Sequence, residues 1–243
     1  MTAASAPARP QRVVVIIPVL DEEQALPLVL RDVPRDLVDE IVVVDNGSRD
    51  RSAEVARAGG ARVVAEPVRG YGAACLAGIA AAAEADVLVF LDGDWSDHPD
   101  DLRALLPPVL ANEADLVIGS RTIDRESRTA LLPQARFGNW LASRLLRLLF
   151  GIRCTDLGPF RVVRRTSLAS LGMQDRDFGW TIEMQVRAHL AGLRVRELPV
   201  RYRPRVGTSK ITGTLRGSVR AGVKILATIV RYRVRPPRLG ARR

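Results

Sequence analysis

The sequence is poor in cysteine and histidine. Its only cysteines, Cys75 and Cys154, lie far apart, and its only histidines are His98 and His189. Two distant cysteines exclude a disulfide scaffold and a cysteine zinc site, and they suit a reducing compartment. Two histidines are too few for a histidine-rich metal centre. We therefore expect the chain to fold around a hydrophobic core without covalent cross-links.

Long apolar runs are missing as well. The longest ones, such as residues 13–20, fall far short of the about 20 residues that a transmembrane helix needs. Residues 1–11 are rich in proline and alanine and lack the apolar core of a signal peptide, so we expect a flexible N-terminus. These absences predict a cytoplasmic protein that reaches a membrane only by peripheral binding, on its cytoplasmic face.

Acidic residues are absent from one end of the chain. The formal net charge is +10, and residues 201–243 carry thirteen Lys or Arg but no Asp or Glu. Residues 1–200 hold the other 24 basic residues and all 27 acidic ones, so this larger part is mildly acidic. Such asymmetry indicates a polyanionic partner, which is a nucleic acid, an anionic membrane surface or a phosphorylated substrate; a solvated basic tail with no partner is the alternative.

Lysine is nearly absent. The 37 basic residues include only two lysines, Lys210 and Lys224. An ammonium group is a compact point charge that suits a phosphate without the fixed fork of a guanidinium. We therefore consider Lys210 a candidate phosphate ligand, with chance retention on a solvated face as the alternative.

What is present is an ordinary globular composition, with 47% hydrophobic and 26% charged residues among 243. Short β-branched runs alternate with segments of helical length in the first 120 residues. This alternation predicts an α/β fold with βαβ units and a mainly parallel sheet flanked by helices. We expect strands over 13–17, 41–44, 62–65, 87–91, 116–118, 160–163 and 195–202, and helices over 22–31, 52–58, 71–83, 99–111, 137–150, 181–190 and 215–233.

Charged side chains follow most of the predicted strands. In open α/β sheets, ligands bind beyond the carboxyl ends of the strands. At these ends stand, in chain order, Glu22, Asp45, Asp92, Asp94 and Arg121. The Asp-Gly-Asp pattern at the fourth end suits a hard cation, Mg²⁺ or Mn²⁺, which completes its shell with water and substrate phosphates. Alone it also fits a polar turn, but with its charged neighbours it predicts a site for a metal and a diphosphate.

A weaker signal competes with this one. Gly70 and Gly72 open a predicted helix, and Asp92 lies 20 residues beyond Gly72, which loosely matches a dinucleotide-binding fingerprint. The position of the third glycine is Cys75, and Gly70 does not directly follow a strand. We expect these two glycines to shape a loop near a nucleotide instead.

Eight motifs stand in a fixed order along the chain: IIPVLDEE, VVDNGSRD, RGYGAA, FLDGDWSDHP, IGSR, TDLGPFR, GWTIEMQ and RVGTSK. Together they resemble the inverting family 2 glycosyltransferases of GT-A fold, and most of all the dolichyl- or polyprenyl-phosphate sugar synthases. The resemblance covers residues 12–212 and implies a GT-A domain there; we expect the flexible segment over 1–11 before it and a basic amphipathic helix and tail over 213–243 after it.

The resemblance also implies a metal-dependent hexosyltransferase. Its donor would be a UDP- or GDP-linked sugar, its acceptor a polyprenyl or dolichyl phosphate, and its cofactor Mg²⁺ or Mn²⁺. A phosphate acceptor is already anionic near pH 7, so no strong general base is needed. The implied donor-binding residues are Pro18, Glu22, Asp45, Asp92 and Arg121; the metal ligands are Asp94 and Asp92; the catalytic candidates are Asp94, Asp156 and Glu183; and the phosphate- or acceptor-binding residues are Arg205, Ser209 and Lys210.

Two predicted helices have basic and apolar residues on adjoining faces. In the last helix, Arg216, Arg220, Lys224 and Arg231 flank an apolar stripe, and the helix that begins at Phe137 has a similar pattern. Basic amphipathic helices lie in a lipid headgroup layer, which predicts an anionic membrane surface as a partner. Ordinary packing on the domain is the alternative.

Three other functions stay open. One is a glycosyltransferase with a non-lipid acceptor. Another is a nucleic-acid-binding α/β protein, but the basic C-terminal region offers only Tyr202 and Tyr232 for base stacking, so we expect no nucleic-acid partner. The third, a nucleotidyltransferase, would have a basic glycine-rich loop after the first strand, where this chain has LDEE.

Overall fold

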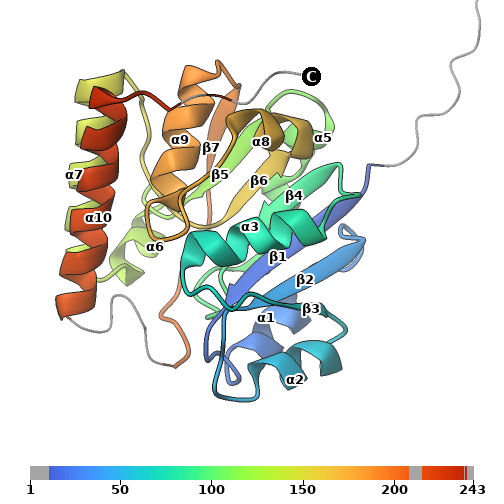
Figure 1. Ribbon diagram of the computed structural model, residues 1–243. Helices are drawn as coiled ribbons and strands as arrows, with labels where there is room; N and C mark the ends of the chain where they lie inside the picture. Colours follow the sequence, from blue (N-terminus) through green and yellow to red (C-terminus); the bar gives the residue numbers. More distant parts are fainter. Residues whose placement is uncertain (1–10, 208–214, 238, 240–243) are drawn as a thin grey trace, which may run out of the picture.

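The computed structural model describes residues 11–207, 215–237 and 239 of the chain. The described part forms a seven-stranded sheet with strand order β3-β2-β1-β4-β6-β5-β7 (Figure 1). Only β6 runs antiparallel to its two neighbours, and the other neighbouring strands are parallel. The predicted α/β fold with a mainly parallel sheet is confirmed. The strands are β1 (Val13–Val19), β2 (Glu40–Asp45), β3 (Arg62–Ala65), β4 (Val87–Phe90), β5 (Leu116–Ser120), β6 (Arg161–Arg164) and β7 (Val195–Pro199).

Alternating side chains of β1 pack into two hydrophobic clusters. Val13, Val15 and Ile17 belong to one cluster, and Val14 and Ile16 belong to the other. Because β1 is buried on both faces, its apolar run is continuous. Helices α1, α2, α4 and α5 cover the first face, whereas α3, α8 and α9 cover the second. The helices are α1 (Leu26–Asp32), α2 (Ser52–Ala58), α3 (Tyr71–Ala81), α4 (Leu102–Leu105), α5 (Pro107–Leu110), α6 (Arg125–Ala130), α7 (Pro133–Phe150), α8 (Arg165–Leu171), α9 (Trp180–Leu190) and α10 (Leu215–Val234).

The structure departs from the predicted helices in three places. The helix expected over 99–111 is divided into a 3₁₀ turn, α4 and α5, because Pro107 and Pro108 cannot donate backbone hydrogen bonds. The short helices α6 and α8 were not predicted. The start of α6 has a recognisable signal, since the Asp124 carboxylate accepts a hydrogen bond from the Ser127 N–H at 2.8 Å.

The last helix, α10, packs on the rest of the domain. Its buried Ile229 and Tyr232 share a third hydrophobic cluster with residues of α7 and α9, and Figure 1 shows α7 and α10 side by side at one edge of the molecule. Val223 and Val230 on α10 remain exposed. The predicted boundary at 212/213 lies outside the described residues. Within the described part, no helix is long and apolar enough to cross a membrane.

Candidate active site at the carboxyl ends of the strands

Three parallel strands end side by side at one edge of the sheet. β1 pairs with β2 on one side and with β4 on the other, so the loops that follow these strands are neighbours. A cavity of about 340 Å³ lies there, and we call it the strand-end pocket. It is lined by five predicted site residues, Pro18, Glu22, Asp92, Asp94 and Arg205, together with Val19, Leu20, Asn46, Arg69, Gly70, Tyr71, Gly93, Asp177 and Phe178.

Asp92 and Asp94 present two carboxylates to this pocket. One oxygen of Asp94 accepts hydrogen bonds from the Ser96 N–H and hydroxyl at 2.9 and 2.6 Å. The other lies 3.1 Å from the Arg205 guanidinium. Burial and the neighbouring Asp94 charge raise the pKa of Asp92 to about 7. A cation bound beside Asp92 would favour the ionised form of its carboxylate.

The loop that holds Asp94 has an unusual backbone. Trp95 has a φ of +62°, a left-handed conformation that non-glycine residues rarely adopt. Its indole N–H donates to Asp32 at 2.7 Å, and the guanidinium of Arg203 lies over its ring, 3.3 Å from the centroid. Arg203 also donates to the Trp95 carbonyl at 2.7 Å. Such a conformation persists where surrounding contacts fix it, so these contacts hold Asp94 in place.

Arg205 reaches the pocket through a segment that returns from β7. The Val206 N–H donates to the Asp94 carbonyl at 3.1 Å, which ties this segment to the Asp94 loop. The Arg205 guanidinium then lies between Glu22, at 2.5 Å, and Asp94, at 3.1 Å. Ser209 and Lys210, the other predicted residues of the same motif, lie outside the described residues.

Asp45 does not line the pocket, although it ends β2. Its carboxylate accepts a hydrogen bond from the Ser48 N–H at 2.9 Å. The next residue, Asn46, lines the pocket and donates to the carbonyls of Glu66 and Val68 at 2.9 and 2.7 Å. Asn46 therefore fixes the loop that precedes α3. Asn46 belongs to the VVDNGSRD motif, of which only Asp45 was predicted to be a site residue.

Gly70 and Gly72 allow a second loop to approach the pocket. A Cβ atom on either glycine would lie 2.1 Å from a backbone carbonyl oxygen, that of Arg176 for Gly70 and that of Asp175 for Gly72. Gly70 also has a φ of +144°. Their predicted role of shaping a loop at the pocket agrees with this geometry. The approaching loop contributes Asp177 and Phe178, which the sequence analysis missed.

Arg121 and Asp156, two further predicted site residues, form a buried pair and do not line the pocket. The guanidinium donates to both carboxylate oxygens, at 2.8 and 2.9 Å. Although burial opposes ionisation, the Arg121 charge lowers the pKa of Asp156 below its usual value. Nearby, neither carboxylate oxygen of the buried Asp97 has a hydrogen-bond partner in the described part of the chain. Burial and the neighbouring Asp92 charge raise the pKa of Asp97 well above its usual range.

Glu183 lies apart from the strand-end pocket. It is completely buried, and its carboxylate accepts hydrogen bonds from Arg187 at 2.8 Å and from the Tyr232 hydroxyl at 2.7 Å. It also accepts the N–H groups of Gln174 and Asp175 at 3.0 and 2.7 Å. These contacts engage both oxygens of the carboxylate, and the structure does not bring Glu183 together with Asp92 and Asp94.

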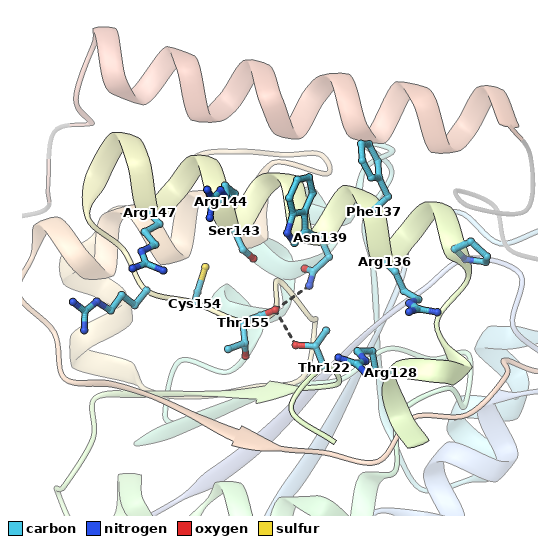
Figure 2. A pocket seen from close by; sticks show the side chains of 13 residues that line it. Thr122, Arg128, Arg136, Phe137, Asn139, Ser143, Arg144, Arg147, Cys154 and Thr155 are labelled. Atoms are coloured by element: carbon cyan, nitrogen blue, oxygen red, sulfur yellow. Dashed lines mark hydrogen bonds between the residues drawn. The ribbon is translucent and has the colours of Figure 1, made fainter. Parts of the chain in front are cut away.

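A second, larger cavity of about 930 Å³ lies along α7, and we call it the arginine cavity (Figure 2). Its floor is formed by Thr122 and Thr155, the sequence neighbours of Arg121 and Asp156. Thr122 and Asn139 both donate to the Thr155 carbonyl, at 2.9 and 3.0 Å. Its wall carries five arginines and two exposed aromatic rings: Arg128, Arg136, Arg144, Arg147, Arg153, Phe137 and Trp140.

The five arginines of this cavity have no acidic partner among the described residues. Many other arginines of the chain are paired, as in Arg62–Glu40 at 2.5 Å and Arg103–Asp36 at 2.7 Å. Five like charges around one cavity repel one another, and a bound anion would relieve that repulsion. The sequence analysis noted the basic pattern of this helix but did not predict a cavity.

The strand-end pocket suits a divalent cation that shares its ligands with a substrate. In the described part of the chain, no group of three or more His, Cys, Asp or Glu is arranged to hold a metal ion. Mg²⁺ sites, however, commonly use one or two carboxylates and obtain the other oxygens from water and substrate phosphates. Asp92 and Asp94 provide that number of carboxylates, and Arg205 stands beside them.

Comparisons with known proteins agree on the family. The model of "Glycosyl transferase family 2" matches residues 14–172. An uncharacterized glycosyltransferase of Mycobacterium tuberculosis is 44% identical over 209 residues, which cover 85% of this chain and 93% of that protein. An undecaprenyl-phosphate mannosyltransferase of Micrococcus luteus is 31% identical, covering 94% and 99%. A dolichyl-phosphate hexose transferase of Haloferax volcanii is 32% identical, covering 91% and 95%.

A solved structure supports the same assignment. Glucosyl-3-phosphoglycerate synthase of Mycobacterium tuberculosis, crystallised with Mn²⁺, UDP-glucose and phosphoglyceric acid, matches with a TM-score of 0.75 and 25% identity. The match covers 94% of this chain and 81% of that one. The predicted GT-A fold is therefore confirmed, and the chain belongs to glycosyl transferase family 2.

Proposed function

We propose that this glycosyltransferase moves a sugar from a UDP- or GDP-linked donor to a polyprenyl- or dolichyl-type lipid phosphate. The arginine cavity is the observation that carries this proposal. Unpaired guanidinium groups suit a phosphate, and the exposed rings of Phe137 and Trp140 suit an apolar chain next to it. The relatives from Micrococcus luteus and Haloferax volcanii, named for such lipid phosphates, support the choice of acceptor.

The donor occupies the strand-end pocket in this proposal. Pro18 and Glu22 lie against the nucleoside, and Arg205 binds the diphosphate, with Ser209 and Lys210 as further phosphate ligands. Asp45 supports the loop beside the nucleoside. Mn²⁺ and UDP-glucose in the solved relative support a nucleotide sugar and a metal. Asp94 and Asp92 would hold Mg²⁺ or Mn²⁺, which would neutralise the charge that develops on the departing diphosphate.

The reaction is a direct displacement. An oxygen of the acceptor phosphate attacks the anomeric carbon from the face opposite the nucleoside diphosphate. The new carbon–oxygen bond forms as the bond to the diphosphate breaks, and its electron pair leaves with the diphosphate, which inverts the anomeric centre. Arg121, fixed by Asp156 and next in sequence to Thr122 of the arginine cavity, orients the attacking phosphate in this proposal. Most of the rate enhancement then comes from positioning and electrostatics.

The enzyme works on an anionic membrane surface on the cytoplasmic side. The exposed apolar side chains of α7, Phe137, Trp140 and Leu148, and those of α10, Val223 and Val230, support this attachment. Basic residues near a membrane surface add about 1 kcal/mol each to the attraction of anionic lipids. The side chains of Arg216 and Arg220 lie outside the described residues.

A non-lipid acceptor is the second candidate. The solved relative was crystallised with phosphoglyceric acid, a small phosphorylated acid. The same unpaired arginines would bind such an anion, but Phe137 and Trp140 would then have no apolar group to contact. The two candidates share the donor and the metal and differ only in the acceptor.

One assay separates the candidates. The purified chain is incubated with UDP- and GDP-linked sugars and Mg²⁺ or Mn²⁺, with polyprenyl phosphate, with 3-phosphoglycerate, or without acceptor. We expect one donor to yield a sugar phosphate only with the lipid. Transfer to 3-phosphoglycerate alone would favour the second candidate. Absence of transfer and of donor hydrolysis from the whole panel would contradict the proposed donors.

A further inference from the structure

The segment between α8 and α9 forms one wall of the strand-end pocket. We call residues 173–178 the pocket loop, and its last two residues, Asp177 and Phe178, line the pocket. On one side α3 holds the loop, since the Ala73 N–H donates to the Arg176 carbonyl at 2.9 Å. Contacts from α9 and α10 hold the other side. The position of this wall therefore depends on contacts with helices, two of which, α9 and α10, contribute no described residue to the pocket lining.

A lysine of α10 reaches the loop directly. The Lys224 ammonium lies 3.3 Å from one carboxylate oxygen of Asp175, whose side chain is only 6% exposed. The other oxygen of Asp175 accepts a hydrogen bond from the Asp177 N–H at 2.8 Å. One carboxylate thus connects α10 with a residue of the pocket wall. Lys224 is one of only two lysines in the chain, and this contact directs it toward the domain.

A tyrosine of α10 reaches the loop through Glu183. The Tyr232 hydroxyl donates to one oxygen of Glu183 at 2.7 Å, and the other oxygen accepts the N–H groups of Gln174 and Asp175 at 3.0 and 2.7 Å. Glu183 is completely buried and Tyr232 is 5% exposed. In a buried environment such hydrogen bonds are strong, and removal of one partner is costly.

The absence of a side chain at Gly179 allows the start of α9, the pocket loop and α10 to pack closely together. A Cβ atom at Gly179 would lie 2.4 Å from the Asp175 carboxylate and 2.7 Å from the Thr228 hydroxyl of α10. The start of α9, the pocket loop and α10 are therefore in close contact at this point. Ile229 and Tyr232 add apolar packing against α7 and α9. This packing fixes the position of α10 relative to the loop.

We propose that α10 sets the conformation of the pocket loop, and that Lys224 and Tyr232 are positioning residues for the nucleotide-sugar donor. Lys224 acts through Asp175, and Tyr232 acts through Glu183. Glu183 is then a positioning residue as well, and does not touch the reacting atoms. The inference rests on the proposed function, because Asp177 and Phe178 contact the donor only if the donor occupies the strand-end pocket.

Hydrogen exchange tests the coupling without any ligand. We expect Lys224→Met and Tyr232→Phe to speed amide exchange in residues 174–177 roughly 10-fold, since each removes one link. Arg233→Met, on the same helix, is the matched control and should leave this exchange unchanged. Lys224→Arg should restore most of the protection. Wild-type exchange of the loop in both variants would overturn the coupling, as would equal acceleration in the control.

Donor binding tests the functional part. With Mn²⁺ present, we expect Lys224→Met to raise the donor KM and the Kd of UDP or GDP roughly fivefold, with kcat and the acceptor KM close to wild type. Adding Asp175→Asn to Lys224→Met should cause no further loss. If the donor binds but these constants do not change, the positioning role is wrong and the proposed function stands. If wild type binds neither nucleoside diphosphate, the proposed function fails, and hydrogen exchange still decides the coupling.

Discussion

The strand-end pocket and the arginine cavity arrange their charges in opposite ways. In the pocket, Arg205 lies within 3.1 Å of the carboxylates of both Glu22 and Asp94. In the cavity, five arginines stand without an acidic partner in the described part of the chain. A paired site must exchange partners when a ligand arrives, whereas an unpaired cluster repels itself until an anion enters. The first arrangement suits a diphosphate that brings a cation, and the second suits a bare anion.

The largest effect is expected from the carboxylates of the pocket. Asp94→Asn should lower the transfer rate roughly 100- to 1000-fold, because an amide is a poor ligand for a hard cation and Arg205 loses one of its two acidic partners. The measurement is initial velocity with saturating Mn²⁺, together with circular dichroism to verify folding. Asp100→Asn is the matched control, since that exposed carboxylate pairs with Arg103 away from the pocket. Full activity of Asp94→Asn, or wild-type activity in excess chelator, would contradict the metal assignment.

The buried Arg121–Asp156 pair should matter most for stability. Asp156→Asn leaves the buried Arg121 charge without its partner and should lower the free energy of unfolding by about 3 kcal/mol, measured with urea at pH 7. Because the pKa of Asp156 is lowered in the folded chain, its contribution is present above about pH 4 and is lost as the pH falls further. The Asn variant should therefore lose less stability than wild type on acidification.

A control separates burial from charge pairing in this prediction. Glu113→Gln breaks a pair with Arg196 in which both side chains are about half-exposed, and exposed pairs contribute little. We expect this variant to unfold close to wild type. An equal decrease in the free energy of unfolding in both variants would show that the contribution of the Arg121–Asp156 pair to stability does not depend on its burial.

The sequence predicted the sheet better than it predicted the surroundings of the site. β1 and β4 are short apolar runs buried on both faces, a pattern that depends on local composition alone. The six-residue α6 is too short to establish a helical period, and only its Asp124 cap marks it. Local signals therefore identify the strands and leave the short connecting helices undetected.

The same distinction applies to the pocket. Glu22, Asp92 and Asp94 could be grouped because parallel strands end at one edge of the sheet. Asp177 and Phe178 lie about 85 residues after β4 in the sequence and reach the pocket only because two glycines allow a close backbone approach. A periodic pattern of residues in the sequence does not indicate such a contact. Tertiary packing, and not local sequence, determines that wall.

The sequence does not show which arginines pair with acidic residues in the folded chain. The excess of basic residues lies in 201–243, but there Arg201, Arg203 and Arg205 are paired with acids in the folded structure. The arginine cavity draws its charges from residues 128–153. The net charge of a segment does not show which of its charges are paired, because the acidic partners come from other parts of the folded chain.

An intermediate effect is expected on acceptor binding. Arg136→Gln and Arg144→Gln should each raise the acceptor KM roughly 10-fold, because a charge-assisted hydrogen bond to phosphate is lost. The donor KM should stay near wild type, since neither residue lines the strand-end pocket. Arg57→Gln, on the opposite side of the sheet from α3, is the control for loss of one exposed charge. A rise in the donor KM alone would mean that the cavity does not receive the acceptor.

The smallest effect gives the most direct test of the comparison between paired and unpaired arginines. Arg62→Gln removes a guanidinium that lies 2.5 Å from Glu40 and donates to the Ala81 carbonyl at 2.9 Å, so it should lower the free energy of unfolding by about 0.5 kcal/mol. Arg144→Gln removes one of five like charges and should leave stability unchanged or slightly higher, most clearly at low ionic strength, where repulsion is least screened. Urea unfolding at two salt concentrations measures both.

Addition of a phosphate-bearing amphiphile should then stabilise wild type more than Arg144→Gln, because a ligand that binds only the folded chain stabilises that chain more when its affinity is higher. If Arg144→Gln instead lowers the free energy of unfolding as much as Arg62→Gln does, the Arg144 charge has a structural partner. The arginine cavity is then not a cluster of unpaired charges that favours a bound anion.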